Sequence, residues 1–89
     1  GHANAFGRAP FGEWLEVLGD RLGEIHIHDN DGTADQHLPV GEGNFPFREL
    51  MALVRQKNLR PILTIESHSD ASLRRMLENI RAMKLLEDF

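Results

Sequence analysis

The stretch EIHIHDNDGTADQHLPVGEGN, residues 24–44, decides the fold and holds much of the titratable chemistry of the chain. Over residues 24–28, two isoleucines alternate with a glutamate and two histidines, which is the two-residue period of a β-strand. The following loop, residues 29–44, is dense in Asp, Gly and Asn and shows no regular period. Titratable side chains therefore gather at the end of a strand and in the loop after it.

Amphipathic helices are predicted before and after this stretch. Apolar residues recur at helical spacing over roughly residues 10–21, and again from near Pro46 to just before Asn58. A last helix is predicted over roughly residues 70–85, and either Ser69 or Asp70 can cap its N-terminus. These periods predict three helices that bury one face each.

The segment RPILTIES, residues 60–67, predicts a second strand over 61–66. In that strand Ile62, Thr64 and Glu66 share one face, and the alternate residues share the other. The predicted order is then helix, strand, helix, strand, helix, and the connections are long enough for parallel strands. This pattern is typical of the α/β class.

Both predicted strands place apolar residues on one face and mostly polar, titratable residues on the other. An open sheet covered by helices on both sides would be apolar on both faces. A closed (β/α)8 barrel explains the polar face, because residues near the carboxyl ends of its strands line the active site. Two strands do not complete a barrel, so we interpret residues 1–89 as a single partial domain. The start at Gly1 rather than Met agrees with a piece of a longer protein.

Composition limits the possible classes of function. The 89 residues contain no cysteine, so a bound metal would need His, Asp and Glu ligands. Ten basic against fourteen acidic residues give a formal net charge of −4, which disfavours binding to a phosphate backbone. The sequence has no signal peptide pattern and no long apolar run, so we expect a cytoplasmic protein without a membrane segment.

The histidines and carboxylates suggest a metal site. A lone histidine on a strand is most often a hydrogen-bonded structural residue, but three of the five histidines lie within twelve positions and are interleaved with aspartates. The group His26, Asp35, His37 and Glu66 therefore favours a metal site, and a solvated acidic loop is the alternative. Asp29, Asn30, Asp31 and Gly32 can equally be turn residues and nothing more.

Four motifs, taken in order, carry a resemblance to a known superfamily. They are GHAN (1–4), HIHDNDG (26–32), DQHLPVGEGN (35–44) and LTIES (63–67). Together they resemble the xylose-isomerase-like TIM-barrel superfamily, which includes sugar isomerases and epimerases and the endonuclease IV type of apurinic site nucleases. The resemblance spans nearly the whole chain and implies the C-terminal part of a (β/α)8 barrel.

The resemblance also implies roles for individual residues. His26 and Glu66 would bind the principal catalytic ion, a divalent metal such as Mn²⁺, Zn²⁺, Co²⁺ or Mg²⁺, and Glu66 would also move a proton. In the multi-metal nucleases, the equivalents of His2, Asp35 and His37 bind a second ion.

Two further residues would shape the substrate site in the resembling enzymes. His28 would line the substrate pocket, and Glu42, between two glycines, would shape the loop over it. An aspartate ligand and the ligands from earlier strands of the superfamily fall outside this chain.

Three functions follow as hypotheses. The first is a metal-dependent isomerase or epimerase acting on a sugar or sugar phosphate. The alternative is a metal-dependent apurinic/apyrimidinic endonuclease, which Asp35 and His37 favour and the net charge disfavours, so DNA is the less favoured partner. The third is that the 89-residue chain is inactive in isolation and self-associates, because a slice of barrel leaves two strand edges unpaired.

Overall fold

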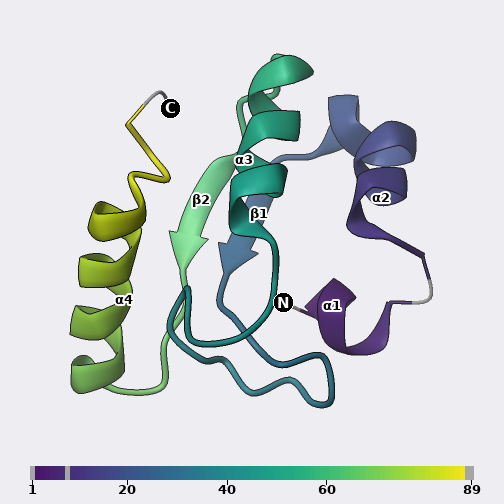
Figure 1. The fold of residues 1–89 in the computed structure, drawn as a ribbon. Coiled ribbons are helices and arrows are strands. Elements are labelled where there is room, and N and C mark those ends of the chain that lie inside the picture. Colours follow the sequence, from purple (N-terminus) through teal and green to yellow (C-terminus); the bar gives the residue numbers. More distant parts are fainter. Residues whose placement is uncertain (1, 8, 88–89) are drawn as a thin grey trace.

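The structure of the chain, a computed structural model, describes residues 2–7 and 9–87. The elements in chain order are α1 (His2–Phe6), α2 (Phe11–Leu18), the 3₁₀ helix η1 (Gly19–Arg21), β1 (Glu24–Ile27), α3 (Phe47–Gln56), β2 (Ile62–Ile65) and α4 (Asp70–Met83) (Figure 1). The five predicted helices and strands are all present within a few residues of their expected bounds. The short helix α1 is an addition that no period in the sequence predicted.

Strands β1 and β2 pair in parallel, and helix α3 lies in the connection between them. Glu24 lies opposite Ile62 and Ile27 opposite Ile65 in the ladder. The backbone N–H of Glu66 donates to the carbonyl of Ile27 at 3.0 Å, so pairing continues one residue past β2. The α/β class with parallel strands is therefore confirmed, and the carboxyl ends of both strands meet at one edge.

The two faces of the sheet differ as their alternation predicts. Four apolar side chains on one face belong to or pack against the core: Ile25, Ile27, Leu63 and Ile65. On the other face Glu24, His26 and Ile62 are exposed, and Ile62 keeps 67% of its surface. One face of the sheet is therefore covered by the chain and the other is left open.

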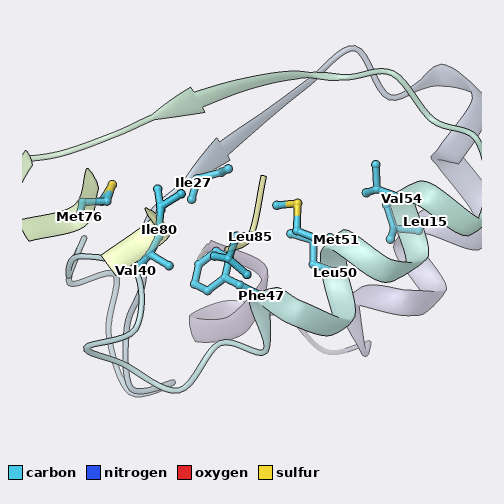
Figure 2. Packing of buried hydrophobic residues seen from close by; sticks show 10 residues of the cluster. All are labelled: Leu15, Ile27, Val40, Phe47, Leu50, Met51, Val54, Met76, Ile80 and Leu85. Atoms are coloured by element: carbon cyan, nitrogen blue, oxygen red, sulfur yellow. The ribbon is translucent and has the colours of Figure 1, made fainter. Parts of the chain in front are cut away.

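The core lies between the strands and helices α3 and α4 (Figure 2). Helix α3 contributes most to it, because four of its apolar residues follow the helical spacing i, i+3, i+4, i+7 and are buried. The buried cluster is Leu15, Ile27, Val40, Phe47, Leu50, Met51, Val54, Met76, Ile80 and Leu85. This packing holds β1 and β2 in place beneath the loop that follows β1.

Helix α4 begins where Ser69 caps it. The Ser69 hydroxyl accepts the backbone N–H of Ser72 at 3.1 Å, and Asp70 becomes the first helical residue. Of the two caps that the sequence allowed, the structure uses Ser69. Among the described residues, no helix is long and apolar enough to cross a membrane.

Candidate metal centre

The strand ends place two side chains of the candidate centre. His28 follows β1 and Glu66 follows β2, so the parallel register brings both to the same end of the same face. His28 is buried, with 4% of its surface exposed, whereas Glu66 is partly exposed. The long loop from β1 to α3 passes this end of the strands (Figure 1).

That loop returns Asp35 and His37 to the strand ends. An antiparallel bridge between Asp29 and Leu38 closes the loop, with both backbone hydrogen bonds at 2.7 Å. His37, just before Leu38, adopts a left-handed backbone conformation with φ of 55°. Its ring lies flat on the ring of His28, with centroids 3.9 Å apart and planes within 2°.

The Glu66 carboxylate faces three imidazoles. His26 Nδ1 lies 3.2 Å from Glu66 Oε2, which is a hydrogen-bond distance. His28 Nε2 lies 3.7 Å from the same oxygen, and His37 Nδ1 lies 3.8 Å from Oε1. The expected approach of His26 and Glu66 is therefore present, and two further rings join it.

The Asp35 carboxylate also faces three imidazoles. His37 Nε2 lies 3.2 Å from Asp35 Oδ2, and His2 Nδ1 lies 3.6 Å from that oxygen. His28 Nδ1 lies 3.9 Å from Oδ1. His28 and His37 are thus shared between the two carboxylates.

Several side-chain atoms of the cluster have no hydrogen-bond partner among the described residues. Among the described residues, His28 Nδ1, His37 Nδ1 and Asp35 Oδ1 are buried without a hydrogen bond. Separations of 3.6–3.9 Å are too long for hydrogen bonds. Two ligands that each lie about 2.0–2.2 Å from one zinc ion, however, are about 3–4 Å from each other. The spacing therefore fits a bound divalent ion.

A three-ligand set stands out within this cluster. One ligand atom from each of His28, His37 and Glu66 lies within 4.8 Å of the others. Imidazole nitrogen together with carboxylate oxygen is a donor set that suits zinc and other divalent first-row metals. The donor types present therefore suit the metal that the superfamily resemblance implies.

The pKa values of His28 and Asp35 are shifted in the direction that metal binding needs. Burial, reinforced by the nearby His37, lowers the pKa of the His28 imidazole. Partial burial acts to raise the pKa of Asp35, but the hydrogen bond and charge of His37 outweigh it, and the pKa lies below its usual value. A neutral imidazole and an ionised carboxylate are the forms that bind metal ions.

Two of the residues singled out from the sequence lie at or beyond the rim of this cluster. The His2 side chain is 75% exposed; it approaches Asp35 of the cluster, and its ring also lies beside that of Phe6 with centroids 5.0 Å apart. Glu42 does not join the cluster. Its carboxylate receives hydrogen bonds from Arg75 of α4 at 3.0 and 3.1 Å, and Asn79 lies 3.3 Å from it.

Sequence reasoning missed two features of the cluster. It gave His28 a place in the substrate pocket, whereas the structure also sets its ring within reach of the ligand atoms of His37 and Glu66. It assigned no site role to His68, whose exposed side chain stacks on the ring of His37 with centroids 4.5 Å apart. The available signal was its position two residues after Glu66 at a strand end.

Comparisons with known proteins identify relatives of this chain. Fructoselysine 3-epimerase of Escherichia coli O157:H7 is 39% identical over 57 residues, which are 64% of this chain and 21% of that protein. An uncharacterized protein of Methanocaldococcus jannaschii is 38% identical over 68 residues, 75% of this chain and 23% of that protein. The chain thus spans about a fifth to a quarter of these relatives. No solved structure matches it significantly.

A family match covers nearly all of the sequence. Residues 1–86 match the family described as Xylose isomerase-like TIM barrel. The parallel strands and the cluster at their carboxyl ends are what such a barrel places at its active-site face. The chain belongs to the xylose isomerase-like TIM-barrel family.

Proposed function

We propose that this chain forms part of the active site of a divalent-metal-dependent isomerase or epimerase that acts on a sugar or sugar phosphate. The observation that supports it most is the convergence of His28, His37 and Glu66 at the carboxyl ends of two parallel strands. The similarity to a fructoselysine 3-epimerase supports the sugar as substrate class.

The metal ligands proposed are those of the superfamily, with His26 and Glu66 at a principal ion. The 3.2 Å approach of His26 to Glu66 supports this pair, and the spacing of His28 and His37 around the same carboxylate adds two further donors. When bound, a divalent ion would act as a Lewis acid toward the adjacent oxygens of the sugar. Mn²⁺, Zn²⁺, Co²⁺ and Mg²⁺ are all candidates.

Glu66 is the proposed proton-transfer residue. Its carboxylate is 38% exposed on the open face of the sheet, so a substrate can reach it, while three imidazoles surround it. We assign it the transfer of a proton at the carbon beside the sugar carbonyl. The buried His28 ring would form part of the pocket floor, and Glu42 would act on the substrate only through the shape of its loop.

This chain is proposed to be inactive alone. Proton transfer of this kind uses a pair of groups, and the superfamily takes the second glutamate and an aspartate ligand from strands that precede this segment. A complete site therefore needs the rest of a barrel, supplied either within a longer protein or by another chain.

A second candidate function is metal-dependent phosphodiester hydrolysis at abasic sites in DNA. One observation favours it: Asp35 lies 3.2 Å from His37 and 3.6 Å from His2, which are the three residues that would bind a second ion. The net charge of −4 weighs against a DNA partner. The epimerase remains the preferred proposal.

A chimera tests the preferred proposal. This chain would replace the corresponding segment of the E. coli fructoselysine 3-epimerase, and epimerisation of fructoselysine would be assayed with added Mn²⁺ or Co²⁺. We expect measurable activity that Glu66→Gln lowers by at least about a hundredfold, because general acid–base catalysis contributes about 10²–10⁴-fold.

The matched control in the chimera is Glu78→Gln. Glu78 is exposed on helix α4 and lies outside the three-ligand set. Its substitution should leave most of the activity. Equal losses in the two variants, or a folded chimera with no activity under any of these metals, would argue against the proposed role of Glu66.

A further inference from the structure

Asp29 has an unusual set of partners for a loop residue. It is completely buried. Its Oδ1 accepts the backbone N–H groups of Asn30 at 2.8 Å and Phe45 at 3.0 Å, and its Oδ2 accepts those of Gly41 and Gly43, both at 3.0 Å. A single carboxylate therefore ties the end of β1 to four points of the following loop.

The backbone of Asp29 adds to this anchor. Its N–H and carbonyl both pair with Leu38 at 2.7 Å, so side chain and main chain together fasten both halves of the loop. The fit is close: a Cβ on Gly43 would lie 2.2 Å from the carbonyl oxygen of Asn30 and 2.5 Å from Asp29 Oδ1. Only glycine can occupy position 43 with the loop in this conformation.

We propose that Asp29 is a positioning residue, which sets the loop residues Asp35 and His37 against the strand residues His28 and Glu66. The loop between β1 and α3 has no helix or strand of its own, so other bonds must fix its path. A buried carboxylate that accepts several N–H groups can do so, because each bond is charge-assisted and its loss leaves a buried group unsatisfied.

The proposed role of Asp29 has two parts. The first is that Asp29 orders the stacked rings of His28 and His37, which can be tested in the protein without metal. The second is that Asp29 thereby sets the affinity for metal, and this part rests on the proposed function. Groups that orient metal ligands typically change metal affinity by about 10–100-fold when they are substituted.

The substitution Asp29→Asn separates this role from simple packing. The side chain keeps its shape but offers one acceptor oxygen and one NH₂ group. In either orientation of the amide, the NH₂ group faces two backbone N–H donors, either those of Asn30 and Phe45 or those of Gly41 and Gly43. Half of the anchor must therefore open.

Asp31→Asn is the matched control. Asp31 lies in the same loop and accepts the N–H of Thr33 at 2.9 Å, but it is exposed and makes no contact with residues 41–45 through its carboxylate. The two variants undergo the same chemical change in the same loop. Only the one at position 29 should disturb the cluster.

The first readout is the NMR spectrum of the imidazole protons without metal. The face-to-face stacking of His28 and His37 shifts these resonances through ring currents. We expect Asp29→Asn to move them toward the positions of free histidine, and Asp31→Asn to leave them at the wild-type positions. The methyl resonances of Val54 and Met76 in the core should stay unchanged in both variants, which distinguishes positioning from a general loss of structure.

The second readout is amide hydrogen exchange in the wild-type chain. The N–H groups of Gly41, Gly43 and Phe45 should exchange slowly although they lie outside helices and strands. If Asp29→Asn does not fold, as far-UV circular dichroism will show, this exchange decides: slow exchange supports the anchor and fast exchange overturns it. Imidazole resonances that are the same in wild type and in folded Asp29→Asn would overturn it as well.

Co²⁺ titration, followed by visible absorption, tests the effect of Asp29 on metal affinity. We expect Asp29→Asn to weaken binding by about 10–100-fold and Asp31→Asn to leave it within about twofold. If the wild-type chain bound no Co²⁺, metal binding by the residues of this chain alone would be ruled out, while the imidazole spectra would still decide the positioning role.

Discussion

At the scale of single residues, two carboxylates organise the candidate centre. Glu66 faces His26, His28 and His37, and Asp35 faces His2, His28 and His37. Most of these separations exceed hydrogen-bond length, so the groups are gathered without being satisfied by one another. Three buried atoms among the described residues, His28 Nδ1, His37 Nδ1 and Asp35 Oδ1, have no hydrogen-bond partner, which destabilises the folded state unless a ligand completes them.

A divalent ion should therefore bind this chain weakly. In calorimetric titrations with Zn²⁺ or Mn²⁺, the double variant Asp35→Ala, His37→Ala should lose more than about tenfold in affinity, since even groups that only orient ligands have effects of about 10–100-fold. Asp31→Ala, which removes an exposed carboxylate from the same loop, serves as the control. The same heat signal from wild type and double variant would refute binding at these residues.

At the scale of elements, an apolar stripe positions helix α3, and a cap at each end delimits helix α4. Helix α3 buries Phe47, Leu50, Met51 and Val54, all on one stripe. Helix α4 relies on a cap at its start and on a left-handed Lys84, φ 55°, at its end. Its side chains Arg75 and Asn79 then bind the loop around Glu42.

The cap of α4 gives a quantitative test. Ser69→Ala removes the acceptor of the Ser72 N–H and should lower the free energy of unfolding by about 1 kcal/mol, within the range of about 0.5–2 kcal/mol for such caps. Urea unfolding followed by circular dichroism measures the change. Ser72→Ala keeps the backbone donor and should stay within about 0.5 kcal/mol of wild type. Equal losses in both variants would mean that the cap contributes little.

At the scale of the whole molecule, the sheet formed within residues 2–7 and 9–87 has two strands, and no further strand of this part of the chain pairs with the outer edge of either. Apolar side chains are also left open, with Val17 75% exposed, Ile62 67% and Trp14 49%. Exposed edges favour pairing with another chain, and a domain of 89 residues has a small core with which to resist it.

We therefore predict self-association of the isolated chain. The interface should include an edge of the strand at 24–28 or at 61–66, together with apolar side chains from the helices at 10–21 and 70–85. Analytical ultracentrifugation at micromolar concentration should show species above the 10.1 kDa monomer mass. Val17→Lys combined with Ile62→Lys should shift the population toward monomer, because both charges would be buried in such an interface.

The control for self-association is Ala52→Lys, at an exposed position of α3. It adds charge outside the expected interface and should leave the distribution unchanged. A single 10.1 kDa species of the wild-type chain that unfolds cooperatively would show that this chain folds alone and needs no partner.

Much of the architecture follows from the sequence by itself. Hydrophobic periods identify α2, α3, α4 and both strands, because burial of one face imposes a period of 3.6 or 2 residues on any chain that forms these elements. Strand parity likewise places His26 and Glu66 on one face. The family motifs also predict a barrel, in which the carboxyl ends of the parallel strands lie at one face.

The tertiary structure alone decided how the loop meets the strands. Several contacts depend on the path of the chain between residues that are 9–33 positions apart. They are the stacking of His37 on the buried His28, the hydrogen bonds of Asp29 and the pairing of Glu42 with Arg75. The short helix α1 has no period from which it could be read. Local patterns report only which face of an element is buried. Contacts across a loop depend instead on the three-dimensional path of the chain and on the acceptors to which its backbone N–H groups donate.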